Sequence, residues 1–348
     1  MKILVWQKNI SLKQYNTFGV DIVAPFFLAI SSEAQLLELI HQPEFQLRSS
    51  VILGGGSNVL FLSLTDQCIL LNQLKGIEWL ASVEPGIQLL KVGGGENWHD
   101  FVGFSLKNHL YGLENLALIP GTVGAAPIQN IGAYGIEVKD FIYAVEVIHL
   151  KTGRKETLTN DECEFGYRDS LFKRKKGTYF ITQVIFKLAL VPQINLQYKD
   201  LATAALAAHD QKITPEWIYR QVIRIRESKL PNPTVIGNAG SFFKNPLVGF
   251  EKCEALKQVY PDLVFFKEKA VGKNLQQYKI SAGFLLEKLG WKGKREGRAG
   301  VYEKHPLILI NLGGATGCEI FALAQQMINA VFEKTGLMLE IEPIVIGY

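Results

Sequence analysis

Hydrophobic residues follow two different spacings along this chain, and the two spacings predict helices and strands. In the predicted helices apolar residues recur every three or four positions, as Leu36, Leu39 and Ile40 do. In the predicted strands apolar residues form short runs that are bounded by glycine or polar residues. The main strand runs lie at residues 51–53, 145–150, 179–188 and 307–310.

Capping residues mark where several of these helices begin and end. Ser32 and Thr316 are each followed three positions later by Gln or Glu, which is the spacing of a capping box. Thr214 with Pro215 is a further helix start, because threonine caps a helix and proline suits its first turn. Gly336 ends the helix that begins after Thr316.

Composition narrows the class of protein. The chain has 348 residues, of which 48% are hydrophobic and 32 are glycine, enough for a large core and about two or three domains. Lys and Arg exceed Asp and Glu by 37 − 33 = 4, and the basic residues form no long block. This slight excess favours anionic small molecules and argues against a nucleic-acid partner, which requires a concentrated basic surface.

Cysteines and the N-terminal residues indicate the cellular compartment. The four cysteines lack CxxC spacing, so we expect no metal site and no disulfide framework, and free core thiols agree with a reducing compartment. Lys2 and Lys8 interrupt any signal-type segment, and the apolar run 22–30 is too short to span a bilayer. We therefore expect a cytoplasmic protein without a membrane partner. The cysteines are Cys68, Cys163, Cys253 and Cys318.

Two glycine clusters directly follow predicted strands. The strand 51–53 runs into Gly54-Gly55-Gly56-Ser57-Asn58, and Val92 precedes Gly93-Gly94-Gly95. Consecutive glycines expose backbone N–H groups that can cradle a pyrophosphate. A tight hairpin turn is the simpler interpretation of one such cluster, and neither cluster has the Walker or the GxGxxG spacing. The presence of two clusters weakens the hairpin interpretation.

Residues 116–135 form a third segment rich in glycine and alanine. Only two side-chain amides interrupt its uncharged surface, which could lie against a flat ring and its phosphates. Such a segment is costly in conformational entropy unless something packs on it, so we interpret it as a cofactor cradle. The predicted cofactor-binding residues are Leu53, Gly54, Gly55, Gly56, Ser57, Asn58, Ile119, Pro120, Gly121, Gly124, Ala125, Gln129, Asn130, Gly132 and Gly135.

Ser241 lies at the centre of the most unusual segment, residues 237–246. Glycines before it allow the backbone to approach a ligand closely, and the two phenylalanines after it could exclude water. The alternative is a loop entering a strand whose phenylalanines belong to the core. Arg226 and Lys229 end the preceding helix, where cations usually stabilise the helix dipole, and here they also lead towards Ser241.

Three further charged residues are candidates for chemistry. Arg168 suits bidentate binding of a carboxylate, although an ion pair with Asp169 is the commoner arrangement for an arginine. Near the C-terminus, a strand predicted at residues 339–343 places Glu340 and Glu342 on one face. The alternation does not choose between these two carboxylates, and a solvated face is the simpler interpretation of either one alone.

Together these segments resemble one family, the UDP-N-acetylenolpyruvoylglucosamine reductases, which are the MurB flavoenzymes of bacterial peptidoglycan synthesis. The matching segments occur in the expected order over nearly the whole chain, and several are long and unusual. They are Asn16-Thr17-Phe18-Gly19, residues 54–60, 112–135 and 165–170, Lys229-Leu230-Pro231, residues 237–246 and the terminal Glu-rich strand.

The resemblance implies an α+β fold, with a two-lobed FAD-binding domain of the PCMH/vanillyl-alcohol-oxidase type and a smaller α+β substrate-binding domain. We expect the FAD-binding domain at residues 17–190 and a tyrosine loop with a connecting helix at residues 191–228. The substrate-binding domain, with the last strand near the active site, is expected at residues 229–348. Leu196-Gln197-Tyr198-Lys199-Asp200 resembles the type I branch, in which a tyrosine loop folds over the substrate.

The resemblance also implies roles for single residues. Ser241 matches the proton donor, Arg168 the arginine that orients the substrate, and Glu342 the catalytic glutamate. Glu340 stays as the alternative, because the family usually reads Glu-Pro-Glu-Val here and only counting back from the closing Ile-Gly selects Glu342. Residues 292–304 depart from the family pattern, which leaves the shape of that loop open. The implied substrate-binding residues are Tyr134, Tyr198, Arg226, Lys229 and Asn245.

The implied reaction has two halves. NADPH reduces FAD, and the reduced flavin passes hydride to the enolpyruvyl ether of UDP-N-acetylglucosamine to give UDP-N-acetylmuramate. We expect a monomer whose partners are these small molecules. One alternative is another FAD-dependent oxidase of the same fold, which commonly tethers FAD through His or Cys, and the glycine loops offer no obvious tether. The other is a non-catalytic UDP-sugar or flavin-binding protein, against which the combination of Ser241, Arg168 and Glu342 argues.

Overall fold

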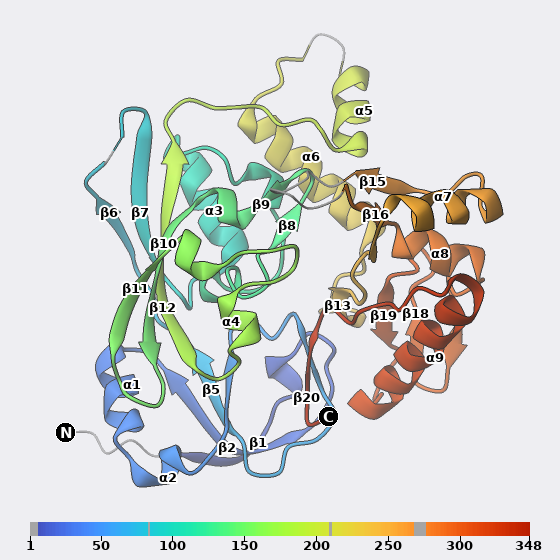
Figure 1. Cartoon of the computed structure of the whole chain (residues 1–348). Helices are drawn as coiled ribbons and strands as arrows, with labels where there is room; N and C mark the ends of the chain where they lie inside the picture. Colours follow the sequence, from blue (N-terminus) through green and yellow to red (C-terminus); the bar gives the residue numbers. More distant parts are fainter. Residues whose placement is uncertain (1–5, 83, 209–210, 268–275) are drawn as a thin grey trace. The chain divides into compact units, whose positions relative to one another are not determined.

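The chain folds as two compact units, each assembled from separate stretches of sequence (Figure 1). The computed structural model describes residues 6–82, 84–208, 211–267 and 276–348. Unit 1 contains the described residues of 6–11, 23–56 and 64–228, and unit 2 contains those of 12–22, 57–63 and 229–348. Two short N-terminal segments, 12–22 and 57–63, therefore pack with the C-terminal part of the chain.

The first sheet of unit 1 is a mixed sheet with the strand order β1-β2-β5-β3. β2 and β3 both run parallel to β5, and β1 is antiparallel to β2. Helices α1 and α2 contribute Leu36, Leu39, Ile40 and Phe45 to the core that this sheet shares with the second sheet. The elements are β1 (Gln7–Ser11), β2 (Val23–Ile30), α1 (Glu33–Ile40), α2 (Pro43–Gln46), β3 (Ser50–Leu53) and β5 (Cys68–Asn72).

The second sheet of unit 1 is antiparallel, with the strand order β11-β10-β12-β7-β6. Its central strands confirm the predicted runs at 145–150 and 179–188. Helix α3 packs on the core of this sheet through Trp98, Phe101 and Val102, all of which are buried. The elements are β6 (Ile77–Leu80), β7 (Ile87–Gly93), α3 (Trp98–Lys107), β10 (Ile142–His149), β11 (Lys155–Thr159) and β12 (Tyr179–Ala189).

Short elements and the helices α4, α5 and α6 complete unit 1. The predicted helix start at Thr214 is confirmed, because the Trp217 N–H donates to Thr214 Oγ1 at 3.2 Å. Ile218 and Val222 are then buried on one face of α6. The elements are η2 (Glu114–Leu116), η3 (Val123–Ala125), β8 (Gly132–Ala133), β9 (Ile136–Glu137), η4 (Val138–Asp140), η5 (Asp161–Cys163), α4 (Leu171–Arg174), α5 (Lys199–Ala207) and α6 (Pro215–Lys229).

In the described part of unit 2, two small antiparallel sheets and the helices α7, α8 and α9 surround one core. The strand orders are β13-β19-β18-β17 and β14-β16-β15. Thr316 and Glu319 form the predicted capping box of α9, and Gly336 ends that helix with a φ of 67°. The elements are β13 (Gly237–Ser241), β14 (Leu247–Val248), α7 (Phe250–Val259), β15 (Phe265–Lys267), β16 (Tyr278–Ile280), α8 (Ala282–Lys288), β17 (Arg295–Glu296), β18 (Ala299–Val301), β19 (Ile308–Asn311) and α9 (Gly317–Thr335), together with η1 (Lys13–Tyr15).

The C-terminal strand differs from the prediction. β20 (Ile344–Ile346) pairs in parallel with β4 (Val59–Phe61), whereas in the predicted strand 339–343 only Ile341 forms an isolated bridge, to Phe243. Pro343 has no N–H group, so the pairing around Ile341 cannot continue into a ladder. The hairpin interpretation of the first glycine cluster is also wrong, since β3 pairs with β5 and β4 pairs with β20.

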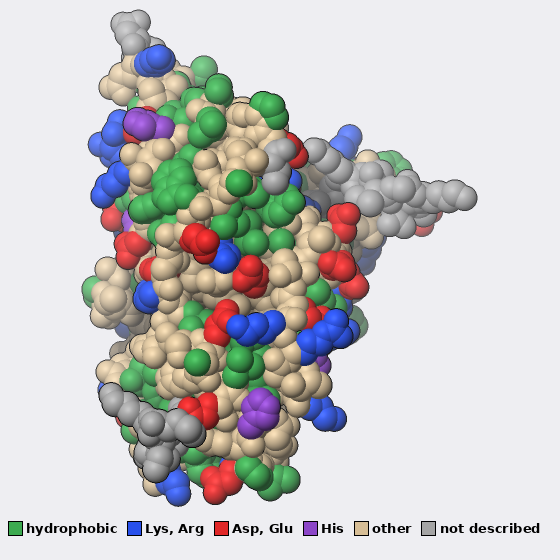
Figure 2. Space-filling model, turned by 90° about the vertical axis from the view of Figure 1, so that its left-hand side faces the viewer, with side chains coloured by type: hydrophobic (Ala, Val, Ile, Leu, Met, Phe, Trp, Pro, Cys, Tyr) green, Lys and Arg blue, Asp and Glu red, His purple; other side chains and the backbone are tan. Residues whose placement is uncertain are grey.

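The surface and the thiols agree with the sequence in most respects. On the face drawn in Figure 2, acidic and basic side chains are interspersed and gather into no block of one sign. Cys68, Cys163 and Cys253 are buried free thiols as expected, but Cys318 is exposed. Among the described residues, no helix combines the length and the apolar character that crossing a bilayer requires.

Candidate active site

The first glycine cluster packs backbone to backbone on the loop that follows η2. A Cβ atom added to Gly54 would lie 2.2 Å from Thr122 Oγ1, and one added to Gly55 would lie 2.8 Å from the Cα of Gly121. Both distances are too short for a Cβ, so Gly55, which faces backbone, requires glycine, and Gly54 requires glycine as long as Thr122 carries its hydroxyl. The close packing brings the end of β3 against residues 121 and 122.

The second glycine cluster packs on the same loop. The Gly124 N–H donates to the Gly94 carbonyl at 2.8 Å, and a Cβ on Gly94 would lie 2.6 Å from the Ile181 carbonyl. The buried Asn72 side chain donates to that same carbonyl at 2.8 Å and so fixes the two sheets of unit 1 to each other. We refer to residues 54–55, 94 and 121–124 as the glycine cradle.

The Thr122 hydroxyl is a polar atom of the cradle that sequence reasoning missed. It is buried, and it has no hydrogen-bond partner among the described residues. A buried hydroxyl without a partner costs about 1–3 kcal/mol, so the site fits a ligand that brings a phosphate or hydroxyl oxygen to this atom. The signal was present in the sequence, because Thr122 is the only aliphatic hydroxyl in residues 116–135.

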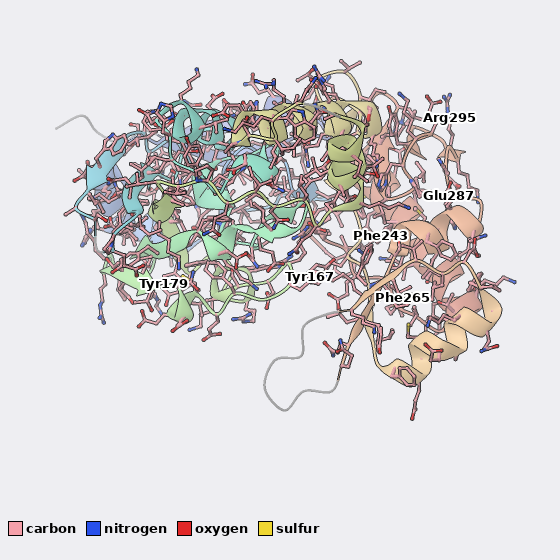
Figure 3. All side chains as sticks on the ribbon, turned by 90° about the horizontal axis from the view of Figure 1, so that it is seen from above. Tyr167, Tyr179, Phe243, Phe265, Glu287 and Arg295 are labelled. Atoms are coloured by element: carbon pink, nitrogen blue, oxygen red, sulfur yellow. The ribbon has the colours of Figure 1, made fainter. Side chains whose placement is uncertain are left out.

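Arg168 is held against the last part of the cradle loop. Its Nη2 atom donates to the Gly132 carbonyl at 2.6 Å, and its backbone has a φ of 52°, which is uncommon for any residue other than glycine. The guanidinium carbon also lies 5.5 Å from the ring centre of Tyr167, which Figure 3 labels. The side chain is therefore fixed in direction before a substrate binds.

Two further hydrogen bonds tie the Arg168 segment to the same loop. Asn130 Nδ2 donates to the Gly166 carbonyl at 3.0 Å, and Ser170 Oγ donates to the Ile128 carbonyl at 2.6 Å. The neighbouring Asp169 forms its ion pair with Arg174. Segments 128–132 and 166–170 thus form one frame, which contains the predicted residues Asn130, Gly132 and Arg168.

Three of the predicted substrate-binding residues come together in unit 1. The rings of Tyr134 and Tyr198 meet edge to face with centres 4.9 Å apart. The positive charge of Arg226 acts on the Tyr134 hydroxyl, and Arg226 Nε donates to the Leu118 carbonyl at 3.1 Å. Burial raises the pKa of Tyr134 to about 12, so its hydroxyl remains a donor at neutral pH. Burial also lowers the pKa of Arg226.

Ser241 ends β13 at an irregular point of the unit 2 sheet. The register of β13 against β19 shifts between Asn238 and Ser241, and Gly240 has a φ of 71°. Asn238 stabilises this turn, since its Oδ1 accepts from the Gly240 N–H at 3.0 Å. The two phenylalanines that follow are at most 1% exposed and belong to the core, as the alternative interpretation expected, so they line no open site.

The two C-terminal carboxylates have different surroundings. Glu340 is 72% exposed and pairs with Lys244, with 2.9 Å between Lys244 Nζ and Glu340 Oε2. Glu342 is half-buried, and its N–H donates to the Phe242 carbonyl at 2.9 Å. Backbone hydrogen bonds on both sides of the bridge to Phe243 (Figure 3) fix this segment beside residues 242–244.

The other predicted residues of unit 2 have structural contacts. Asn245 Oδ1 accepts from the Ala282 N–H at 2.9 Å at the start of α8. The backbone carbonyl of Asn58 accepts from the Ile344 N–H at 2.9 Å, and the cofactor contact of this residue stays a prediction. Ser57 and Asn58 thus pack in unit 2, whereas residues 53–56 pack in unit 1, so the structure divides that predicted set. Lys229, the last residue of α6, is exposed.

The loop at residues 292–304 has a defined shape. It contains the β17–β18 hairpin, and Arg298 binds both carboxylate oxygens of Glu319 at 3.1 and 3.0 Å. Glu319 also accepts from the Thr316 N–H, so one carboxylate caps α9 and holds the hairpin. Hydrogen bonds from Thr316, followed by the one from Arg298, lower the pKa of Glu319 to about 2.

Comparison with known proteins decides the family. Residues 232–346 match the model of the UDP-N-acetylenolpyruvoylglucosamine reductase C-terminal domain, and residues 24–159 match an FAD binding domain. The curated UDP-N-acetylenolpyruvoylglucosamine reductase of Polynucleobacter asymbioticus is 46% identical over 97% of this chain and 95% of its own length. That of Paraburkholderia xenovorans is 44% identical over 96% and 95%. This chain belongs to the UDP-N-acetylenolpyruvoylglucosamine reductase family.

A solved structure from this reductase family shows the same fold. The Thermus caldophilus enzyme aligns over 98% of this chain and 99% of its own, with a TM-score of 0.64 at 24% identity. The predicted α+β fold, with an FAD-binding part followed by a smaller C-terminal part, is therefore confirmed. The match to the FAD binding domain includes the whole glycine cradle, which agrees with the cofactor prediction for this segment.

Proposed function

We propose that this chain is an FAD-dependent oxidoreductase that reduces the enolpyruvyl ether of UDP-N-acetylglucosamine to UDP-N-acetylmuramate, with NADPH as the reductant. The observation that carries this proposal is the 46% identity to a curated reductase of that name over 97% of the chain. The product is a peptidoglycan precursor. The activity therefore serves cell-wall synthesis, and through it cell shape and division.

FAD fits the glycine cradle of unit 1. The cradle presents backbone without side chains, and the partnerless Thr122 hydroxyl can hydrogen-bond a phosphate or ribityl oxygen. When bound, FAD supplies hydride transfer between NADPH and the enolpyruvyl double bond. The protein contributes binding, orientation and electrostatic stabilisation around that chemistry.

Arg168 binds the carboxylate of the enolpyruvyl group in this proposal. Hydride adds to the terminal alkene carbon, so negative charge develops on the carbon beside the carboxylate and spreads into it. A guanidinium that is already fixed by the Gly132 carbonyl stabilises this charge without reorganising during the reaction. The edge-to-face pair of Tyr134 and Tyr198 is the proposed contact with the rest of the substrate, together with Arg226, Lys229 and Asn245.

Ser241 delivers the proton that completes the reduction. A hydroxyl is a weak acid, but the carbanionic carbon that receives the proton is strongly basic, and a positioned general acid contributes about 100- to 10,000-fold. Glu342 acts as a hydrogen-bonding group, because a bare carboxylate would repel the developing charge. We prefer it to Glu340 because Glu342 is half-buried, whereas Glu340 is exposed and paired with Lys244.

The protein is proposed to be a cytoplasmic monomer. The three buried free thiols suit a reducing compartment. Light scattering of the purified protein checks the oligomeric state against the chain mass of 38.9 kDa. A mass near twice this value would contradict the monomer.

An anaerobic absorbance experiment tests the activity and the role of Ser241 together. NADPH should bleach the flavin of the wild-type protein, and the enolpyruvyl ether should restore its colour. Ser241→Ala should slow only the second step, by about 100- to 10,000-fold. Ser82→Ala, a change at an exposed hydroxyl of unit 1, is the matched control and should alter neither step.

Each unexpected result has a distinct meaning. A protein that does not take up FAD would contradict the cofactor. Bleaching without recovery would favour the oxidase alternative. Equal slowing of both steps in Ser241→Ala would contradict the proton-donor role and leave the activity in place.

A further inference from the structure

Leu118 has an unusual backbone immediately before the cradle loop. Its φ is 57°, in the left-handed region, although it is neither a glycine nor an asparagine. This conformation is disfavoured for an ordinary residue by about 5- to 30-fold. Residues 119–122 follow directly and lead into the glycine cradle, so the direction in which the chain enters the cradle depends on this one strained residue.

Two side chains from different helices bind both polar groups of the Leu118 backbone. The Leu118 N–H donates to His99 Nδ1, on α3, at 3.0 Å. The Leu118 carbonyl accepts from Arg226 Nε, on α6, at 3.1 Å. In an ordinary conformation Leu118 would turn these two groups in other directions, so the pair of hydrogen bonds selects the left-handed form.

His99 can do this only as the neutral ring. A ring nitrogen that accepts a hydrogen bond carries no proton, so the proton of His99 is on Nε2, which lies 3.3 Å from the Tyr219 hydroxyl. The two rings are nearly parallel, with 7° between their planes. Burial lowers the pKa of His99; the nearby Asp100 opposes this effect and Arg226 adds to it.

The same turn of α3 also supports the loop on either side of Leu118. Trp98 Nε1 donates to the Leu116 carbonyl at 2.9 Å, and the Trp98 N–H donates to the Gly121 carbonyl at 3.1 Å. These bonds hold residues 116 and 121. The strained Leu118 peptide between them is held by His99 and Arg226. The charge of Arg226 also acts on the Tyr134 hydroxyl, so Arg226 links this peptide to a proposed substrate contact.

We propose that His99 and Arg226 are positioning residues for FAD, which hold the Leu118 peptide in the left-handed form that directs residues 119–122 into the glycine cradle. The inference rests on the proposed FAD-binding role of the cradle. Neither residue needs to touch the cofactor. When the His99 acceptor is lost, Leu118 adopts an ordinary backbone conformation. FAD binding must then return this residue to the left-handed form, which weakens the affinity.

The test measures FAD affinity of the apo-protein by the quenching of flavin fluorescence. His99→Phe keeps a flat ring beside Tyr219 but removes the acceptor, and it should weaken FAD binding by about 5- to 30-fold, the bias against left-handed leucine. Adding Leu118→Gly should restore the affinity, because glycine adopts this conformation without strain. His149→Phe is the matched control: His149 Nδ1 also accepts a backbone N–H, from Lys151, in a turn outside the cradle.

A second pair of variants covers the case in which His99→Phe does not fold. His99→Asn places an oxygen near the position of Nδ1, and His99→Gln places one near Nε2. Binding by His99→Asn should stay close to wild type, and binding by His99→Gln should be weaker.

The inference is overturned if His99→Phe binds FAD as tightly as wild type, if glycine at 118 restores nothing, or if the Asn and Gln variants bind equally. Failure of the wild-type protein to bind FAD would instead overturn the proposed function, and this inference with it.

Discussion

Alanine at Gly54 should damage the glycine cradle in a way that a second substitution repairs. The new Cβ would lie 2.2 Å from Thr122 Oγ1, while its other near contacts, Ala125 Cβ and Thr122 Cβ, are at 3.3 and 3.4 Å. Only the Thr122 hydroxyl therefore clashes severely with the new Cβ. Gly55→Ala differs, since its Cβ meets the Gly121 backbone at 2.8 Å, and a backbone cannot rotate aside.

The expected magnitudes follow from these contacts. Gly54→Ala should destabilise the apo-protein by about 1–3 kcal/mol, the range for forcing an extra methyl group into a packed site. Thr122→Ala removes the colliding oxygen, so the double variant should recover most of that loss, with a coupling of about 0.5–3 kcal/mol. Thr122→Ala should not repair Gly55→Ala, because the Gly121 backbone stays where it is.

Equilibrium urea unfolding of the apo-proteins measures these differences, provided that the m-values stay constant. Gly283→Ala is a control that should change the free energy of unfolding in the opposite direction. Its nearest neighbour atom is 3.6 Å away and it lies in α8, so alanine should stabilise it by up to about 1 kcal/mol. Equal repair of Gly54→Ala and Gly55→Ala by Thr122→Ala, or repair of neither, would refute this account of the cradle.

Three further predictions concern single side chains. Cys318 should be the one thiol that a disulfide reagent labels quickly in the native protein, since the other three are buried, and Cys318→Ser should abolish that fast phase. Glu319→Gln should lower the Tm at pH 7. Because the folded pKa of Glu319 is depressed to about 2, the difference in Tm between wild type and variant should shrink as the pH falls from about 4.5 towards 2. A difference in Tm that stays constant over this range would contradict the assignment. Arg168→Lys should raise KM for the enolpyruvyl ether and leave flavin reduction by NADPH unchanged in stopped flow, because lysine lacks the planar fork.

Features that depend on neighbouring residues were predicted well from the sequence. The capping box at Thr316 and the helix start at Thr214 each depend on contacts within three residues, so the local letters determine them. The glycine cradle left a compositional trace, because close backbone packing forbids side chains, whereas its role in binding the cofactor stays a prediction. The backbone of Leu118 left no such trace, since leucine normally avoids the left-handed region.

Pairing between distant segments could not be predicted from the sequence. Segments 12–22 and 57–63 pack in unit 2, where a Cβ on Gly237 would meet the Phe18 carbonyl at 2.2 Å and β4 pairs with β20. Nothing in the local pattern of either segment specifies a partner that lies 219 residues (Phe18 to Gly237) or 285 residues (Val59 to Ile344) further along the chain. The same limit applies to Asn58, whose backbone hydrogen bond to Ile344 was not predicted, and its contact with the cofactor stays a prediction.

The choice between Glu340 and Glu342 shows what the structure adds to the alternation of side chains along a predicted strand. Both were assigned to one face of a strand, but that segment forms only a bridge, and the two side chains differ in burial. An exposed pair such as Glu340 with Lys244 contributes about 0–1 kcal/mol, so Glu340→Gln should change neither half-reaction. Glu342→Ala, which removes the hydrogen-bonding group, should slow flavin reoxidation by the enolpyruvyl ether by about 100- to 1,000-fold, as loss of one preorganised group does at other developing charges. Rapid-mixing measurements of both variants decide the matter, because the reverse ranking would move the catalytic role to Glu340.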